Sequence, residues 1–192
     1  MWNDHYTKKA KKEKYPARSV YKLKEIQDKY KIIKKGAKVL DLGCAPGSWL
    51  LFASKLIGNG GRIIGIDIQD FEIKQPENTL IFKDDIFSLN AETKKAFENG
   101  FDVILSDMAP STTGNKNTDA ARSYNLCMSA FFIVKEHLKS DGAFICKIFQ
   151  GEDFNDFLNR IKKAFKWYKI FKPASCRKGS KEIYIIGTGY IN

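Results

Sequence analysis

Short apolar runs alternate with stretches of helical spacing along most of this chain, and this alternation constrains the fold more than any other feature. In the first helical stretch, for example, Val20, Leu23 and Ile26 fall on one helix face. Strands that alternate with helices at this spacing pair in parallel, and the connecting helices cover both faces of the sheet. Strands are predicted in A-K-V-L-D-L, R-I-I-G-I-D, T-L-I-F-K, F-D-V-I-L-S-D and G-A-F-I-C-K-I-F, helices over 18–30, 48–57, 90–98, 120–138 and 152–165, and loops over 69–78 and 108–119.

The C-terminal segment departs from this alternation. W-Y-K-I-F and E-I-Y-I-I-G-T-G are separated only by a basic loop, which favours an antiparallel hairpin at the edge of the sheet. We therefore expect an α/β fold: a mostly parallel sheet with an antiparallel C-terminal edge hairpin and helices on both faces. No repeat or low-complexity linker divides residues 1–192, so we expect a single domain.

Four polar residues stand at the edges of apolar runs. They are Lys22, Asp107, Lys147 and Glu182, in the segments S-V-Y-K-L, V-I-L-S-D-M-A-P, A-F-I-C-K-I-F and S-K-E-I-Y-I-I-G. The strand ends of an α/β sheet are the usual place for chemistry. Two lysines and two carboxylates there predict a site that deprotonates a weak acid and holds an anionic substrate.

The segment V-L-D-L-G-C-A-P-G-S-W indicates a cofactor site. Gly43 and Gly47 would let the backbone approach a ligand at a helix N-terminus, and Asp67 ends the next strand, where a carboxylate can accept both ribose hydroxyls of an adenosine. The G-x-x-x-G spacing is neither the dinucleotide fingerprint nor a P-loop, which disfavours a nicotinamide oxidoreductase. The acidic pair Asp84-Asp85 suits a cationic cofactor without phosphate, so we expect S-adenosylmethionine, with S-adenosylhomocysteine as the product.

The formal net charge of +11 is concentrated at the two ends, while the middle of the chain is close to neutral. Such a distribution predicts a polyanionic partner bound by both ends. We expect residues 1–35 to form a basic segment and helix that bind this polyanion, and residues 36–192 the catalytic body. The family resemblance given below implies that the polyanion is RNA, and the predicted RNA contacts are Lys8, Lys9, Lys11, Lys12, Lys14, Arg18, Arg177 and Lys178. Tyr15, Tyr21 or Tyr124 could stack on a base.

Cysteine content and hydropathy argue against a metal site and against a membrane partner. The four cysteines form no C-x-x-C pair and histidine is scarce, so we expect no metal site, and we expect Cys127 and Cys146 to be buried thiols. No apolar run is long enough to span a bilayer, so no membrane partner is expected. We expect a monomer located in the cytoplasm, or in mitochondria if a presequence has been removed.

With these motifs in view, nearly the whole chain resembles the FtsJ-type (RrmJ-like) ribosomal RNA 2′-O-ribose methyltransferases. The resemblance rests on K-K-A-K-K-E-K-Y-P-A-R-S-V-Y-K-L-K-E-I, D-L-G-C-A-P-G-S-W, S-D-M-A-P-S-T-T-G, K-I-F-Q-G and R-K-G-S-K-E-I-Y-I-I. It implies a Rossmann-like, S-adenosylmethionine-dependent fold and a catalytic tetrad at the four polar residues named above. Cofactor contacts are expected at Gly43, Ala45, Pro46, Gly47, Trp49, Asp67, Ile68, Asp85, Ile86 and Asp107.

These expectations define a mechanism. Lys147 is the candidate base for a ribose 2′-hydroxyl, and Lys22 would remain charged and stabilise the developing oxyanion. Burial favours a neutral Lys147 whereas nearby carboxylates favour a charged one, and the sequence leaves that balance open. The implied substrate is ribosomal RNA or the large ribosomal subunit, with a uridine as target. The alternatives are an enzyme that methylates tRNA or an mRNA cap, and a catalytically silent RNA-binding assembly factor.

Overall fold

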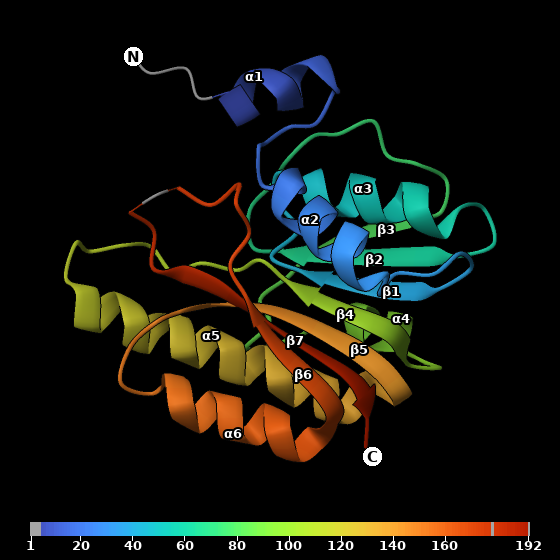
Figure 1. The fold of residues 1–192 in the computed structure, drawn as a ribbon. Coiled ribbons are helices and arrows are strands. Elements are labelled where there is room, and N and C mark those ends of the chain that lie inside the picture. The colour runs from blue at the N-terminus through green and yellow to red at the C-terminus, as the bar shows by residue number, and fades with distance from the viewer. Residues whose placement is uncertain (1–4, 178, 192) are drawn as a thin grey trace.

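The computed structural model describes residues 5–177 and 179–191, in which a seven-stranded sheet carries the fold (Figure 1). The strands run in the order β3-β2-β1-β4-β5-β7-β6; β7 is antiparallel to both of its neighbours, and every other pair is parallel. Their bounds are β1 Lys38–Leu42, β2 Arg62–Asp67, β3 Thr79–Lys83, β4 Phe101–Ser106, β5 Leu138–Phe149, β6 Phe165–Phe171 and β7 Glu182–Tyr190. The predicted mostly parallel sheet with an antiparallel edge hairpin is confirmed.

Helices cover both faces of this sheet. In Figure 1, α2 and α3 lie on one face, while α5 and α6 lie on the other. The first helix, α1, stands above α2 and contacts it through Ala10, which packs against Val20 and Tyr21. The bounds of the helices are α1 His5–Lys12, α2 Val20–Tyr30, α3 Ser48–Ile57, α4 Ala91–Ala96, α5 Lys116–His137 and α6 Phe154–Ala164.

The central strands are buried on both sides, as parallel strands between two helical layers must be. One core cluster fills the space between the sheet and α5 and α6, around Phe144 and Phe157. A second cluster fills the space under α2 and α3, around Leu23 and Leu50. These two cores hold β1, β2 and β4 rigidly, so that the residues just beyond their carboxyl ends share one edge of the sheet.

Several boundaries differ from the sequence prediction. The basic run near the N-terminus forms a helix, α1, that was not predicted. The fifth helix begins at Lys116, inside the predicted loop 108–119, because the Asn115 side chain accepts hydrogen bonds from two backbone N–H groups of its first turn. The fifth strand begins at Leu138 rather than at Gly142, and it ends at Phe149 as predicted, two residues beyond Lys147.

Two kinds of site are absent from the part of the chain that the structure describes. None of its helices is both long and apolar enough to cross a bilayer. None of its His, Cys, Asp and Glu side chains gather in a group suited to hold a metal ion. The thiols of Cys127 and Cys146 are buried, as predicted.

Candidate active site

The four predicted polar residues come from four different elements and meet at the carboxyl edge of the sheet. Lys22 lies in the first turn of α2, and Asp107 directly follows β4. Lys147 lies in β5, and Glu182 is the first residue of β7. Because β5 and β7 pair in antiparallel register, the start of β7 lies beside the end of β5 and brings Glu182 to this edge.

Two ion pairs join these side chains. The Nζ of Lys22 lies 2.9 Å from Oε2 of Glu182, and the Nζ of Lys147 lies 3.0 Å from Oδ1 of Asp107. Lys147 also donates to the backbone carbonyl of Asp107. The side chains are largely shielded, with Lys147 only 6% exposed. Two buried lysines therefore have charged partners, which reduces the cost of removing them from water.

Tyr184 links the two ion pairs. It lies directly across from Lys147 in the sheet, its hydroxyl donates to Oδ1 of Asp107 at 2.5 Å, and its ring centroid lies 5.9 Å from Nζ of Lys22. Burial, and then the charge of Asp107, raises the pKa of Tyr184 well above its ordinary value, so the hydroxyl keeps its proton. Tyr184 was not predicted from the sequence, because its position opposite Lys147 follows only from the strand register.

The pKa values of the site follow from this arrangement. Burial would raise the pKa of Asp107, but the charges of Lys147 and Lys22 and the Tyr184 hydroxyl outweigh it and lower that pKa. Burial would lower the pKa of Lys22, but the carboxylates of Asp107 and Glu182 outweigh it and raise the pKa. Asp107 is therefore a carboxylate and Lys22 an ammonium near neutral pH.

A cavity of about 280 Å³ adjoins the tetrad at the ends of β1, β2 and β4. None of the described residues that line it is a lysine or an arginine, whereas four are acidic. Seven of the ten predicted cofactor residues line this cavity. They are Gly43, Ala45, Asp67, Ile68, Asp85, Ile86 and Asp107; the other lining residues are Ile66, Gln69, Asp84, Phe87, Met108, Ala109 and Leu126.

Backbone contacts shape this cavity. The carboxylate of Asp67 accepts hydrogen bonds from the N–H groups of Ala45 at 2.8 Å and Gln69 at 2.9 Å, which leaves each oxygen a further lone pair. Gly43 has a φ of +73° and lies against Met108, whose side chain would overlap a Cβ at that position. Glycine is thus required at Gly43 both for the backbone conformation and for the close approach of Met108.

The other three predicted cofactor residues do not line the cavity. Gly47 caps the N-terminus of α3 with a φ of +98°, and Pro46 precedes it. Trp49 is buried; its indole N–H donates to the carbonyl of Ser19 at 2.9 Å and its ring lies 5.8 Å from that of Tyr184. Trp49 therefore packs α3 against α2 beside the tetrad, and its contact with the cofactor stays a prediction.

A further acid, Asp41, lies in β1, where it interacts electrostatically with the cavity acids Asp107 and Asp67; it was not singled out from the sequence. It is fully buried, and neither carboxylate oxygen has a hydrogen-bond partner among the residues that the structure describes. Burial, followed by the charges of Asp107 and Asp67, raises the pKa of Asp41 well above its ordinary value. The four acids that line the cavity favour a cationic ligand.

A second cavity, of about 310 Å³, lies on the other side of the tetrad. Lys22 and Glu182 line it together with Arg18 and Arg177. Arg18 donates to the carbonyl of Ser175, and burial, followed by the charge of Arg177, lowers the pKa of Arg18. Two arginines beside one cavity suit an anionic ligand such as a phosphodiester. Lys178, also predicted to contact RNA, lies outside the described residues.

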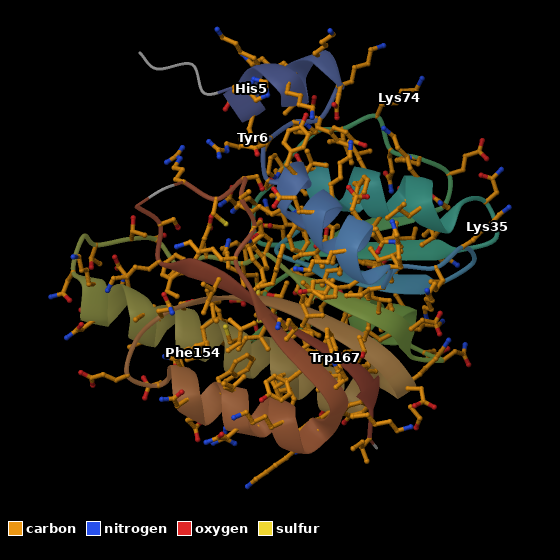
Figure 2. The ribbon with its side chains drawn as sticks, in the orientation of Figure 1. His5, Tyr6, Lys35, Lys74, Phe154 and Trp167 are labelled. Atoms are coloured by element: carbon orange, nitrogen blue, oxygen red, sulfur yellow. The ribbon has the colours of Figure 1, made fainter. Side chains whose placement is uncertain are left out.

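The remaining predicted RNA contacts lie on and after α1, which Figure 2 shows standing above the sheet with His5 and Tyr6 labelled. Lys8, Lys9, Lys11, Lys12 and Lys14 are all exposed there. Of the three tyrosines considered for base stacking, Tyr21 is buried, and that expectation is wrong for it. The Tyr124 hydroxyl donates to Asp156 at 2.6 Å, and the ring of Tyr15 lies under Lys55.

Comparison with known proteins decides the family. Residues 15–190 match the FtsJ-like methyltransferase family. The chain belongs to the FtsJ-like methyltransferases.

Two relatives of this FtsJ-like methyltransferase carry the name ribosomal RNA large subunit methyltransferase E. The one from Desulforapulum autotrophicum is 54% identical over 98% of this chain and 93% of its own length. The one from Desulfatibacillum aliphaticivorans is 51% identical over 97% of this chain and 90% of its own length. A crystal structure of a ribosomal RNA methyltransferase from Plasmodium falciparum superposes with a TM-score of 0.82 at 29% identity, covering 93% of this chain and 100% of that one.

Proposed function

We propose that this FtsJ-like methyltransferase transfers a methyl group from S-adenosylmethionine to a ribose 2′-hydroxyl of large-subunit ribosomal RNA, with a uridine as the target. One observation carries the proposal. Asp107 lines the first cavity, lined by four acids and here called the acidic cavity. Lys22 and Glu182 line the second, which also contains Arg18 and Arg177 and is here called the basic cavity. Tyr184 joins the two ion pairs of the tetrad. A cofactor in the first cavity and an RNA in the second would therefore meet at the tetrad. The names of the two relatives support large-subunit ribosomal RNA as the substrate.

The acidic cavity fits this cofactor. It offers carboxylates to a cationic ligand and no lysine or arginine, among its described residues, to a phosphate. Asp67, Asp85 and Asp107 would hold the bound molecule. S-adenosylmethionine supplies a methyl group already activated by its sulfonium.

Lys147 is the proposed base. Its ammonium contacts both Oδ1 and the backbone carbonyl of Asp107, so once it has released one proton to solvent its two remaining N–H groups can stay bonded there. The remaining lone pair is then free to accept the proton of the 2′-hydroxyl. Lys22, held charged by Glu182, would stabilise the oxyanion that develops as the proton leaves. Asp107 and Glu182 act by positioning the two lysines.

The RNA would lie across the basic cavity and α1. We propose that residues 1–35 bind the RNA and residues 36–192 form the catalytic body, with Arg18 and Arg177 contacting the phosphates beside the target nucleotide. Lys178, the next residue in the sequence after Arg177, is proposed to contact RNA as well. We further propose that the enzyme acts as a monomer in the cytoplasm, without a metal ion.

The test is transfer of labelled methyl groups to large ribosomal subunits, free ribosomal RNA and tRNA. We expect label in the ribosomal RNA, as a 2′-O-methyl nucleoside after digestion. Lys147→Ala and Lys147→Arg should both lose at least about 100-fold in rate, because neither side chain can act as a base. Lys163→Ala, on the exposed face of α6, is the matched control and should retain the rate. Label mainly in tRNA, or full activity of Lys147→Arg, would contradict the proposal.

A further inference from the structure

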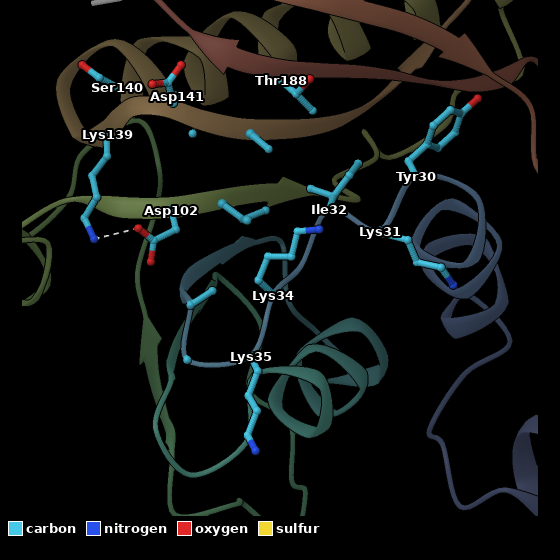
Figure 3. Close-up of a pocket in the computed structure, with 15 residues that line it drawn as sticks. Tyr30, Lys31, Ile32, Lys34, Lys35, Asp102, Lys139, Ser140, Asp141 and Thr188 are labelled. Carbon is cyan, nitrogen blue, oxygen red and sulfur yellow. Dashed lines mark hydrogen bonds and ion pairs between the residues drawn. The ribbon is translucent and has the colours of Figure 1, made fainter.

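A cavity of about 550 Å³ lies at the opposite edge of the sheet (Figure 3). It is formed by the connection between α2 and β1, the start of β4 and a turn early in β5. Asp102 at this edge and Asp107 in the tetrad are five residues apart along β4 and just beyond it, which corresponds to about 16 Å. The cavity is therefore separate from both cavities of the active site.

The lining of this cavity is positively charged. Lys31, Lys34 and Lys35 line it and form no ion pair with any residue in the described ranges. In Figure 3 the Lys34 side chain extends toward Ile32 and the cavity. The two acids of the lining are already neutralised: Asp102 by Lys139 at 2.8 Å, and Asp141 by Lys166 at 2.6 Å.

The charges around this edge reinforce one another. Burial, and then the charges of Lys139 and Arg62, lowers the pKa of Lys38, the first residue of β1. A group of lysines beside acids that are already paired attracts an anion.

Aromatic side chains stand at the rim of the same cavity. Tyr30 lines it, and its ring centroid lies 5.6 Å from that of Trp167. Trp167 lies in the edge strand β6, across from Thr188, and remains 42% exposed (Figure 2). The hydroxyl of Tyr30 is shielded from solvent and has no partner among the described residues. Lysines beside an exposed indole are the combination that binds single-stranded RNA, through phosphates and stacked bases.

A path connects this cavity to the tetrad. Helix α2 runs from Lys22 in the tetrad to Tyr30 at the cavity, a distance of about 12 Å. Lys29, in its last turn, lies over the rings of Tyr30 and of Phe171 at the end of β6, 5.6 and 5.1 Å from their centroids. An RNA strand that leaves the tetrad can follow α2 and β6 over cationic and aromatic side chains.

We propose that this cavity, at the amino edge of the sheet, is a second RNA-binding site. It holds an unpaired nucleotide of the substrate that is distant from the nucleotide to be methylated. Lys31 and Lys34 contact the phosphodiester, and Trp167 with Tyr30 stacks against the base. The inference rests on the proposed function only in assuming that RNA is the substrate.

Binding can be measured without methyl transfer, by the anisotropy of a fluorescein-labelled single-stranded RNA over a range of salt concentrations. The double variant Lys31→Gln, Lys34→Gln should bind about 20-fold more weakly at 0.1 M salt, with a salt slope reduced by about 1.4, because each phosphate contact on a single strand accounts for about 0.7. The control Lys162→Gln, Lys163→Gln removes the same charge from α6 and should change neither. Equal effects of the two double variants would overturn the site, since net charge alone would then explain the binding.

The aromatic half of the site has its own test. Trp167→Ala should weaken binding about fivefold with an unchanged salt slope, and Trp167→Phe should restore most of the affinity. Cofactor affinity reports whether each variant is folded. An unchanged affinity in a folded Trp167→Ala would overturn the stacking role. A wild-type protein that binds this RNA through Lys31 and Lys34, but labels no RNA, would refute the proposed methylation and leave the second site standing.

Discussion

The Tyr184 hydroxyl should stabilise the folded protein by an amount that depends on pH. Tyr184→Phe keeps the buried ring and removes one hydrogen bond, donated at 2.5 Å to the carboxylate of Asp107. Hydrogen bonds to charged groups contribute about 1.5–3 kcal/mol, so we expect the free energy of unfolding to fall by about 2 kcal/mol at pH 7. For a chain of this size that lowers the melting temperature by about 4–8 °C.

The pH dependence has a definite sign. The pKa of Asp107 is lowered in the folded protein, so its ionised form contributes stability above the ordinary aspartate pKa of about 3.9. That contribution is lost as the pH falls through the lowered pKa of the folded state. Removing one of the groups that lowers this pKa should therefore matter at pH 7 and matter less below about pH 4.

Urea denaturation followed by circular dichroism between pH 7 and pH 3 measures the effect. Tyr190→Phe is the control, since Tyr190 lies in the same strand, is 6% exposed, and its hydroxyl bonds to no residue in the described part of the chain. We expect a loss of less than about 0.5 kcal/mol for this control at every pH. Equal losses in the two variants, or a Tyr184→Phe loss that persists unchanged at pH 3, would refute the electrostatic account of the tetrad.

Two further substitutions test the cofactor cavity and the core. Gly43→Ala should destabilise the protein by at least about 2 kcal/mol and weaken cofactor binding at least tenfold by calorimetry, because φ is +73° and the new Cβ would overlap Met108; Gly60→Ala, with open space around it, should do neither. Phe157→Ala should cost about 3–5 kcal/mol in chemical denaturation, since its ring is fully buried. Phe132→Ala, at a position 62% exposed on α5, should stay within about 0.5 kcal/mol, and a loss as large as that of Phe157→Ala would contradict the assignment of the core.

Local patterns were sufficient for the elements of the fold, because strand and helix periodicities are properties of neighbouring residues. The helix from Ser48 to Ile57 and the strand that ends at Asp67 were predicted with the bounds the structure shows. The boundaries that failed depend on single contacts. Asn115 accepts hydrogen bonds from two backbone N–H groups and so starts α5 inside a segment whose polar composition indicated a loop.

The candidate site divides in the same way. Its charged members could be selected from the sequence, because ionisable residues at the edges of apolar runs are unusual enough to notice and belong to motifs of the family. Their pairing could not be selected. Lys22 and Glu182 are 160 residues apart, and only the insertion of β7 between β5 and β6 brings them to 2.9 Å. The packing role of Trp49 likewise follows from where α2 lies, which its neighbours in the chain do not reveal.

The chain's residue order alone was enough to indicate the sheet, the acids at the strand ends that form the cofactor site, and the positive charge at both ends of the chain. Each of these features is encoded within a few consecutive residues. Tertiary structure decided which charges neutralise one another and that Tyr184 joins the two ion pairs. It also decided that a separate cavity lined by lysines, with the exposed Trp167 beside its Tyr30, lies at the amino edge of the sheet. The physical reason is the sequence distance over which each interaction acts. Periodicity and turn chemistry act between neighbours, whereas electrostatic pairing and cavity formation depend on distances set by strand order and register.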